Sequence, residues 1–88
     1  MGKNPTEHTP GFDKGWALLT SYQKQQVLGA IDLFRHNPTH ESLRTHVLRN
    51  SDVTSISADD DLRILLRVRP DGSILLLDVG SHERVYGE

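Results

Sequence analysis

Apolar residues recur at helical spacing through the first half of the chain. Two segments, 12–19 and 20–37, repeat an apolar residue every three or four positions, as one face of an α-helix requires. These residues are Phe12, Trp16 and Leu19 in the first segment, and Val27, Ile31 and Phe34 in the second. The short interval between the segments predicts two consecutive helices, arranged as a helical hairpin.

The sequence also carries start and stop signals for these helices. Thr20 and Gln23 fit a capping box, in which each side chain accepts a hydrogen bond from the backbone of the other. Asn37-Pro38 ends the second helix, because the residue before a proline avoids the helical conformation. Gly15 weakens the first helix by about 1 kcal/mol relative to alanine, so this helix depends on packing to form.

The period of the pattern changes from helical to alternating after residue 53. We expect a weak strand at 53–58, a strong strand at 62–69 and a third strand at 73–79. Pro70-Asp71-Gly72 is a turn sequence that joins the last two strands as a hairpin. The chain is therefore predicted to have an α+β fold, with a two-helix hairpin packed on one face of a small, mainly antiparallel twisted sheet.

The strong strand presents two different faces. Even positions Leu62, Ile64, Leu66 and Val68 form an apolar face that fits beneath the helices. The other face carries Arg63, Arg67 and Arg69. Three arginines on one face form either a solvated sheet surface or a cationic floor for a phosphate-bearing ligand, because the planar guanidinium group matches phosphate geometry.

Composition narrows the classes of function. The 88 residues make one small domain, expected at 12–88, after an N-terminal segment at 1–11 that forms a flexible arm or a short edge strand. The absence of cysteine excludes disulfides, thiolate zinc sites and thiol nucleophiles. No apolar run is long enough to span a membrane. We therefore expect a cytoplasmic protein without a membrane partner.

The sequence supports two other kinds of site, a metal site and a serine hydrolase site, less well. A metal site would draw on His36, His40, His46 and the run Asp59–Asp61, but Pro38 interrupts the helical spacing of the first two histidines. A serine hydrolase would need a nucleophile elbow, and the chain has none. The prediction is a protein without a metal or another cofactor.

Three stretches of the chain resemble one protein family. Residues 37–48 resemble the pattern NP-x-H-x-x-L-x-x-H-x-L, residues 61–64 resemble a DLRI strand, and residues 77–86 resemble L-x-V-G-T-H-D-E-V-Y. These motifs, in this order and after a helical hairpin, are typical of the RelE/ParE toxin superfamily. The resemblance covers residues 12–87 and is greatest to the RelE/YafQ branch of mRNA interferases.

The resemblance implies a function and partners. Members of this branch are toxins of type II toxin–antitoxin pairs, which enter the ribosomal A site and cleave the mRNA held there. The ribose 2′-hydroxyl attacks the adjacent phosphate without a metal ion. Such a reaction needs a base, an acid and fixed cations for the phosphate charge. The implied partners are a cognate antitoxin, the ribosome and its mRNA.

The resemblance also assigns candidate site residues. His46 and His82 match positions with acid–base roles, for which the ordinary pKa of histidine is suited. Arg63 matches the arginine that contacts the scissile phosphate, and Tyr86 matches an aromatic residue that stacks on a base or moves a proton. Asp61 matches a carboxylate that orients a histidine or the RNA. Arg67 and Arg69 are expected as secondary RNA contacts.

The chain departs from the family pattern in four respects, one of which is that the stretch between His46 and Asp61 is a residue or two short. Lys or His is typical on the strand that here reads Ser55-Ile56-Ser57, the first strand is reduced to residues near 6–10, and the chain is acidic, with a net charge of −2 and a pI of 6.2. These departures support an alternative of another class: a catalytically weakened RelE-like protein that acts as an antitoxin-binding module. Endoribonuclease activity is therefore the first hypothesis and binding alone the second.

Overall fold

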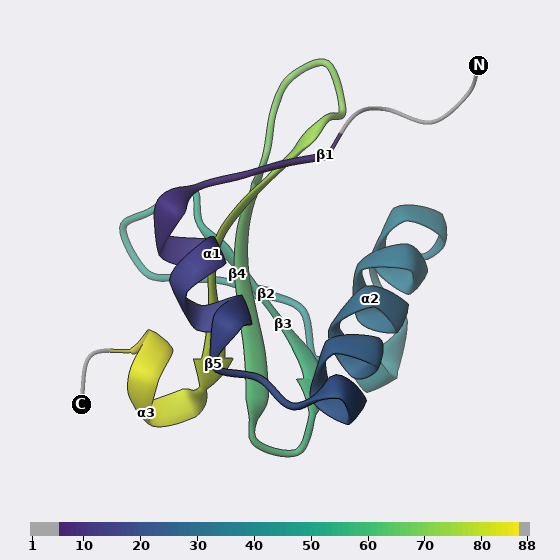
Figure 1. Ribbon diagram of the computed structural model, residues 1–88. Coiled ribbons are helices and arrows are strands. Elements are labelled where there is room, and N and C mark those ends of the chain that lie inside the picture. Colours follow the sequence, from purple (N-terminus) through teal and green to yellow (C-terminus); the bar gives the residue numbers. More distant parts are fainter. Residues whose placement is uncertain (1–5, 87–88) are drawn as a thin grey trace.

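The computed structural model describes residues 6–86 of the chain, which form helices and strands in the predicted order (Figure 1). The elements are β1 (Thr6–His8), α1 (Pro10–Ala17), α2 (Ser21–His36), a 3-10 helix η1 (Glu41–Leu43), β2 (His46–Val47), β3 (Thr54–Asp59), β4 (Leu62–Val68), β5 (Ile74–Ser81) and α3 (His82–Val85). Among these residues no helix is long and apolar enough to cross a membrane.

The strands form one sheet in the order β1-β5-β4-β3-β2. All neighbours are antiparallel except β1, which pairs in parallel with β5 at the edge. Helix α1 packs mainly on β5, and α2 packs on β3 and β4. Both helices contribute to the same apolar layer, so the predicted α+β fold with two helices on one face of a mainly antiparallel sheet is confirmed.

The core lies between this helical layer and the even-numbered residues of β4. Leu62, Ile64 and Leu66 are buried, as the alternation predicted. The remaining core residues are Phe12, Val27, Ala30, Ile31, Phe34, Leu43, Ile56, Ile74, Leu76 and Val79. Val68 was expected in this face but is 46 % exposed. Val68 is the last residue of β4, and the β4–β5 hairpin extends beyond the two helices at this end (Figure 1).

Both helices begin at side-chain caps. The capping box of α2 is confirmed, because the Thr20 hydroxyl accepts from Gln23 N and the Gln23 side chain accepts from Thr20 N. The predicted end of α2 is also confirmed, with Asn37 as its C-cap. Helix α1 begins two residues earlier than expected, because Thr9 caps it and proline is favoured in a first helical turn.

Gly15 permits a close approach between α1 and β5. A Cβ atom at this position would lie 2.1 Å from the carbonyl oxygen of Val79, which is closer than any real contact. The glycine that weakens α1 as an isolated helix therefore allows the packing that stabilises it. This is why the predicted helix forms despite Gly15.

Three short elements were not predicted. β2 has two residues, η1 three and α3 four, which is too short for a periodic pattern. Of the N-terminal segment 1–11, residues 6–8 form an edge strand and residues 10–11 belong to α1. Residues 1–5 of the expected arm lie outside the described part of the chain. Helix α3 begins where Ser81 caps it, directly after β5.

Candidate functional site

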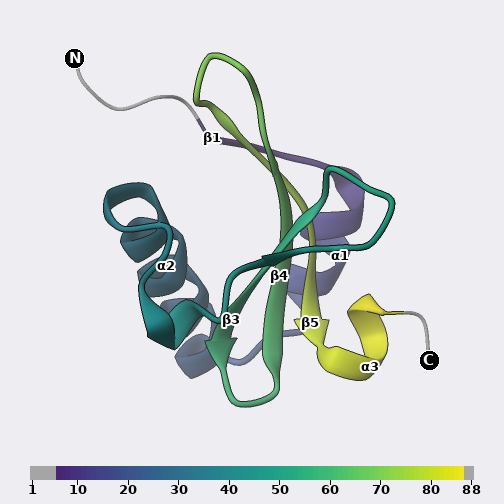
Figure 2. The same ribbon diagram turned by 180° about the vertical axis from the view of Figure 1, so that it is seen from behind.

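One face of the sheet points away from α1 and α2, and we call it the outer face. It is defined by the residues that alternate with the core residues: His46 on β2, Ser55 and Ser57 on β3, Arg63, Leu65 and Arg67 on β4, and Asp78 and Gly80 on β5. Helix α3 lies beside β5 at one end of the sheet (Figure 2). Most of the predicted site residues lie on this face or on α3.

Tyr86 attaches the C-terminal segment to the outer face. Its hydroxyl lies 2.5 Å from the Ser55 hydroxyl, and Ser55 is fully buried at 0 % exposure. His82, one helical turn earlier, packs edge-on against the Tyr86 ring with 4.3 Å between ring centroids. The structure therefore brings two predicted site residues together, and it adds Ser55 as the partner of the Tyr86 hydroxyl.

His46 reaches the same region from the opposite edge of the sheet. In the antiparallel ladder it lies directly opposite Ser55, and paired residues project from the same face. Its imidazole is exposed, with Nδ1 3.4 Å from the carbonyl oxygen of Arg44. His46 and the His82–Tyr86 pair thus flank Ser55, one from β2 and the others from α3.

Arg63 is the most unusual group on the outer face. Its Nε and Nη1 atoms are buried, and among the described residues they have no hydrogen-bond partner. A buried cation without a partner is costly, because it loses hydration and gains nothing in return. An anion that accepts hydrogen bonds from this guanidinium group would remove the cost, so Arg63 favours binding of a phosphate or carboxylate.

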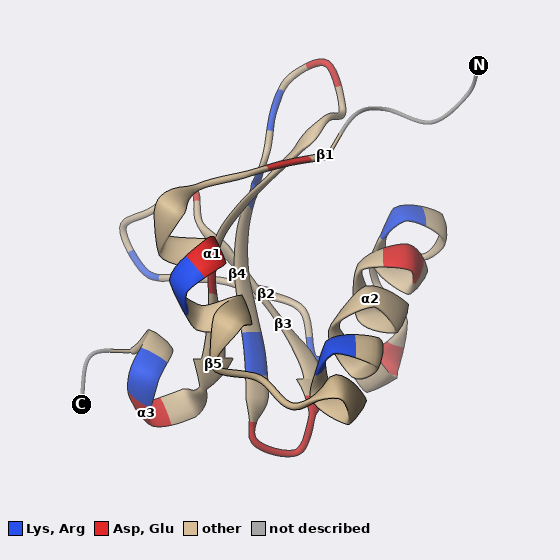
Figure 3. Cartoon of the chain, viewed as in Figure 1, with Lys and Arg blue, Asp and Glu red and all other residues tan. Residues whose placement is uncertain are grey.

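The other two arginines, Arg67 on β4 and Arg69 directly after it, are already paired. Arg67 Nε lies 3.0 Å from an Asp52 oxygen, and Arg69 Nη1 lies 3.0 Å from a Glu7 oxygen. Figure 3 shows basic residues along β4 and an acidic turn between β3 and β4. The three arginines that share one face in the sequence therefore differ in the structure. Only Arg63 combines burial with unpartnered donors in the described part of the chain.

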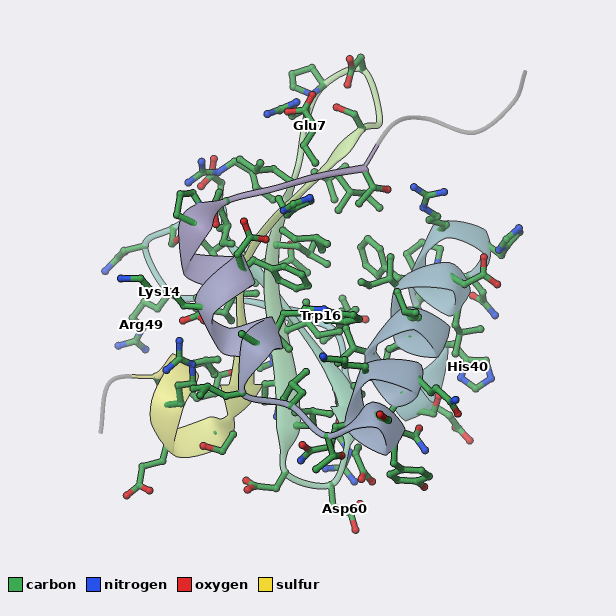
Figure 4. The ribbon with its side chains drawn as sticks, viewed as in Figure 1. Glu7, Lys14, Trp16, His40, Arg49 and Asp60 are labelled. Atoms are coloured by element: carbon green, nitrogen blue, oxygen red, sulfur yellow. The ribbon has the colours of Figure 1, made fainter. Side chains whose placement is uncertain are left out.

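Asp61 lies at one end of the outer face, two positions before Arg63. It belongs to the exposed β3–β4 turn and lines a pocket of about 270 Å³ together with Leu62, Gly80 and Arg84. In Figure 4, Asp60 projects from the tip of this turn and His40 projects beyond α2. Within residues 6–86, no three His, Asp or Glu side chains lie close enough to hold a metal ion.

Sequence reasoning missed Ser55 and Arg84. Ser55 was regarded as the replacement of an expected cation, and its partner Tyr86 is 31 positions away. Arg84 was not considered, and its Nε donates a hydrogen bond to the carbonyl oxygen of Val79 on β5 at 3.3 Å. No local pattern indicates either contact, because both depend on the way α3 folds back over the sheet.

Comparison with solved structures assigns this arrangement to a known fold. The chain aligns with YafQ from Escherichia coli strain BL21(DE3) at a TM-score of 0.80, covering 97 % of this chain and 100 % of that chain at 15 % identity. The chain has the RelE-like fold. The intact E. coli RelBE toxin–antitoxin complex matches at a TM-score of 0.71 and 20 % identity, covering 93 % and 100 % of the two chains.

A further RelE-like structure is the YoeB/ParE toxin from Agrobacterium tumefaciens, with a TM-score of 0.77 and 12 % identity over 89 % of this chain and 98 % of that chain. No protein-family model and no curated protein sequence matches the chain. The resemblance seen in three motifs is thus confirmed at the level of the fold, which the chain shares over nearly its whole length.

Proposed function

We propose that the chain is the toxin of a type II toxin–antitoxin pair, and that it cleaves mRNA on the ribosome without a metal ion. The observation that carries this proposal is that the buried Nε and Nη1 donors of Arg63, on the outer face, have no hydrogen-bond partner among the described residues. Histidines and a tyrosine approach the same face from β2 and α3. The RelE-like fold and the sequence motifs agree with this function, and such a toxin would act in the cytoplasm.

The reaction uses the chain's own side chains. The RNA 2′-oxygen forms a bond to phosphorus while the bond from phosphorus to the 5′-oxygen breaks, which leaves a cyclic phosphate and a 5′-hydroxyl. His46 and His82 share the two proton transfers, one removing the 2′-hydroxyl proton and the other protonating the leaving 5′-oxygen. Arg63 binds the phosphate oxygens as their charge increases.

Three residues have supporting roles in this proposal. Tyr86 stacks on a base or positions the substrate, and its contact with Ser55 holds the ring in place. Arg67 and Arg69 contact RNA beyond the cleaved bond, and each must leave its acidic partner to do so. Asp61 is exposed on the β3–β4 turn, so we assign it no proton transfer.

The second partner is a cognate antitoxin. The RelBE structure, described as an intact toxin–antitoxin complex, motivates this assignment. An antitoxin that covers the outer face would pair acidic groups with Arg63 and inhibit cleavage. The alternative function, binding an antitoxin without catalysis, is favoured by Ser55 and Ser57, which stand where a lysine or histidine is typical of the family.

Induced expression with mapping of mRNA 5′ ends tests the proposal. We expect the parent chain to arrest growth and to produce new 5′-hydroxyl ends, and Arg63→Gln or His82→Ala to abolish both effects. Lys14→Gln is the matched control, because it removes one positive charge from the exposed side of α1 (Figure 4). Soluble parent protein that causes no arrest and no new ends would refute the nuclease and leave the binding module.

A further inference from the structure

Positive charge on this chain is placed differently from the family pattern. The strand that typically carries Lys or His has Ser55 and Ser57, both of which are buried. Conversely, the pattern L-x-V-G-T-H-D-E-V-Y has an acidic residue where this chain has Arg84. A cation is missing from β3 and one is gained on α3, on a segment that folds back toward the outer face.

Arg84 lies flat against β5 at Gly80. A Cβ atom on Gly80 would come within 2.4 Å of Arg84 Cδ and 3.2 Å of Arg84 Nε. The side chain therefore occupies the space that any larger residue at position 80 would fill. Its Nε donates to the carbonyl oxygen of Val79 and lies 3.8 Å from an Asp78 oxygen. Both contacts use Nε, at the root of the guanidinium group, and the two Nη groups extend beyond it.

Gly80 is also the register partner of Arg63. The two residues lie directly opposite each other on β5 and β4, so the Arg63 side chain leaves the sheet on the side where Arg84 covers Gly80. Two arginines from different elements thus adjoin one glycine. One of them, Arg63, has buried donors without a partner.

An anion bound between these arginines would be stabilised by both of them. The Asp78 carboxylate lies 3.8 Å from Arg84 and also accepts from Val79 N. The carboxylates of Asp59 and Asp61 line the same pocket as Arg84, and together these acids offset part of the positive charge. A phosphate group has several acceptor oxygens and can bind two guanidinium groups at once. A glycine floor lets such a group approach the backbone closely.

We propose that Arg84 is a second phosphate-binding residue, which holds the same RNA phosphodiester as Arg63 above Gly80. It supplies the cation that is missing from β3. The ligand class is single-stranded RNA, and the proposal rests on the proposed function of the site. In the reaction Arg84 would bind the oxygens that gain negative charge, in the manner of Arg63 and from the opposite side.

The test is binding of a short RNA that contains one 2′-deoxynucleotide at the cleavage site and therefore cannot be cut. Fluorescence anisotropy over a range of salt concentrations gives the affinity and its salt dependence. We expect Arg84→Gln to lower affinity about tenfold or more and to reduce the slope of log affinity against log salt by about 0.7, the value for one phosphate contact to a single strand. Arg84→Lys should keep the slope and lose part of the affinity.

Controls separate this inference from folding and from the proposed function. Lys14→Gln removes one positive charge, as Arg84→Gln does, from the exposed side of α1, and it should not weaken binding. Thermal unfolding confirms that each variant is folded at the assay temperature. If Arg63→Gln weakens binding and Arg84→Gln changes neither affinity nor slope, the inference is overturned while the nuclease stands. If both weaken binding and the parent cuts no mRNA, Arg84 binds phosphate and the nuclease fails.

Discussion

Substituting alanine for glycine should have opposite effects at two positions on the helical layer. Gly15 in α1 faces β5, where an added Cβ would lie 2.1 Å from the carbonyl oxygen of Val79 and 3.1 Å from its Cγ1 atom. Gly29 in α2 is exposed, and an added Cβ would meet nothing within 4 Å. The two substitutions are chemically identical, so any difference in stability reports their surroundings.

The magnitudes follow from this geometry. Alanine is favoured over glycine in a helix by about 1 kcal/mol, and Gly29→Ala should gain this amount in free energy of unfolding. Gly15→Ala has the same gain in helix propensity, but α1 must move away from β5, and overpacking of this kind costs about 1–3 kcal/mol. The difference between the variants is therefore about 1–3 kcal/mol, in favour of Gly29→Ala.

Urea and thermal unfolding followed by circular dichroism measure this difference. For a domain of this size, 1 kcal/mol shifts the midpoint of thermal unfolding by about 4–8 °C. We expect Gly29→Ala to unfold above the parent chain and Gly15→Ala to unfold below Gly29→Ala by at least this interval. If Gly15→Ala is as stable as Gly29→Ala, α1 does not approach β5 as closely as the structure shows.

Three further perturbations test other parts of the fold. Thr20→Ala removes the cap of α2 and should cost about 1 kcal/mol in urea unfolding, whereas Thr39→Ala, in an exposed turn, should cost almost nothing. Ile64→Ala leaves a cavity at the fully buried centre of β4 and should lower the free energy of unfolding by about 2–5 kcal/mol. Ile64→Val should lower it by only about 0.5–1.5 kcal/mol, and the shift of the urea midpoint measures both losses. Ser73 donates hydrogen bonds from its backbone N–H and its hydroxyl to the Asp71 carboxylate, and these bonds lower the pKa of that carboxyl. The stability that they add to the folded chain is therefore present above the ordinary pKa of aspartate and is lost as the pH falls through the lowered value. The difference in urea midpoint between the parent and Asp71→Asn should therefore shrink between about pH 5 and about pH 2; a constant difference would show that these bonds do not act through the ionised carboxylate.

Local patterns were sufficient to predict most of the fold. The two helices, the strands β3, β4 and β5, and the buried face of β4 each follow from periodicity within a few residues. Caps and turn residues act over equally short distances, which is why the start of α2 and its end at Asn37 were predicted to the residue. The exceptions are elements of two to four residues, because these form only when the rest of the sheet is already in place.

The candidate site was predictable in its residue types but not in its arrangement. Spacing placed Arg63, Arg67 and Arg69 on one face without distinguishing between them. The structure distinguishes them, because Asp52 and Glu7 reach the latter two and no described residue reaches the buried donors of Arg63. Asp52 lies on a loop and Glu7 on an edge strand, and the spacing of residues within β4 does not predict where these other segments lie.

The sequence by itself determined which segments form helices and strands and which face of β4 is buried, since these properties depend on neighbours along the chain. Only the tertiary structure decided which side chains meet on the outer face. Strand register sets Ser55 opposite His46 and Gly80 opposite Arg63, and the return of α3 brings Tyr86 and Arg84 to those positions. Contacts of this kind arise from backbone pairing between distant segments, so residue order alone does not encode them in any local pattern.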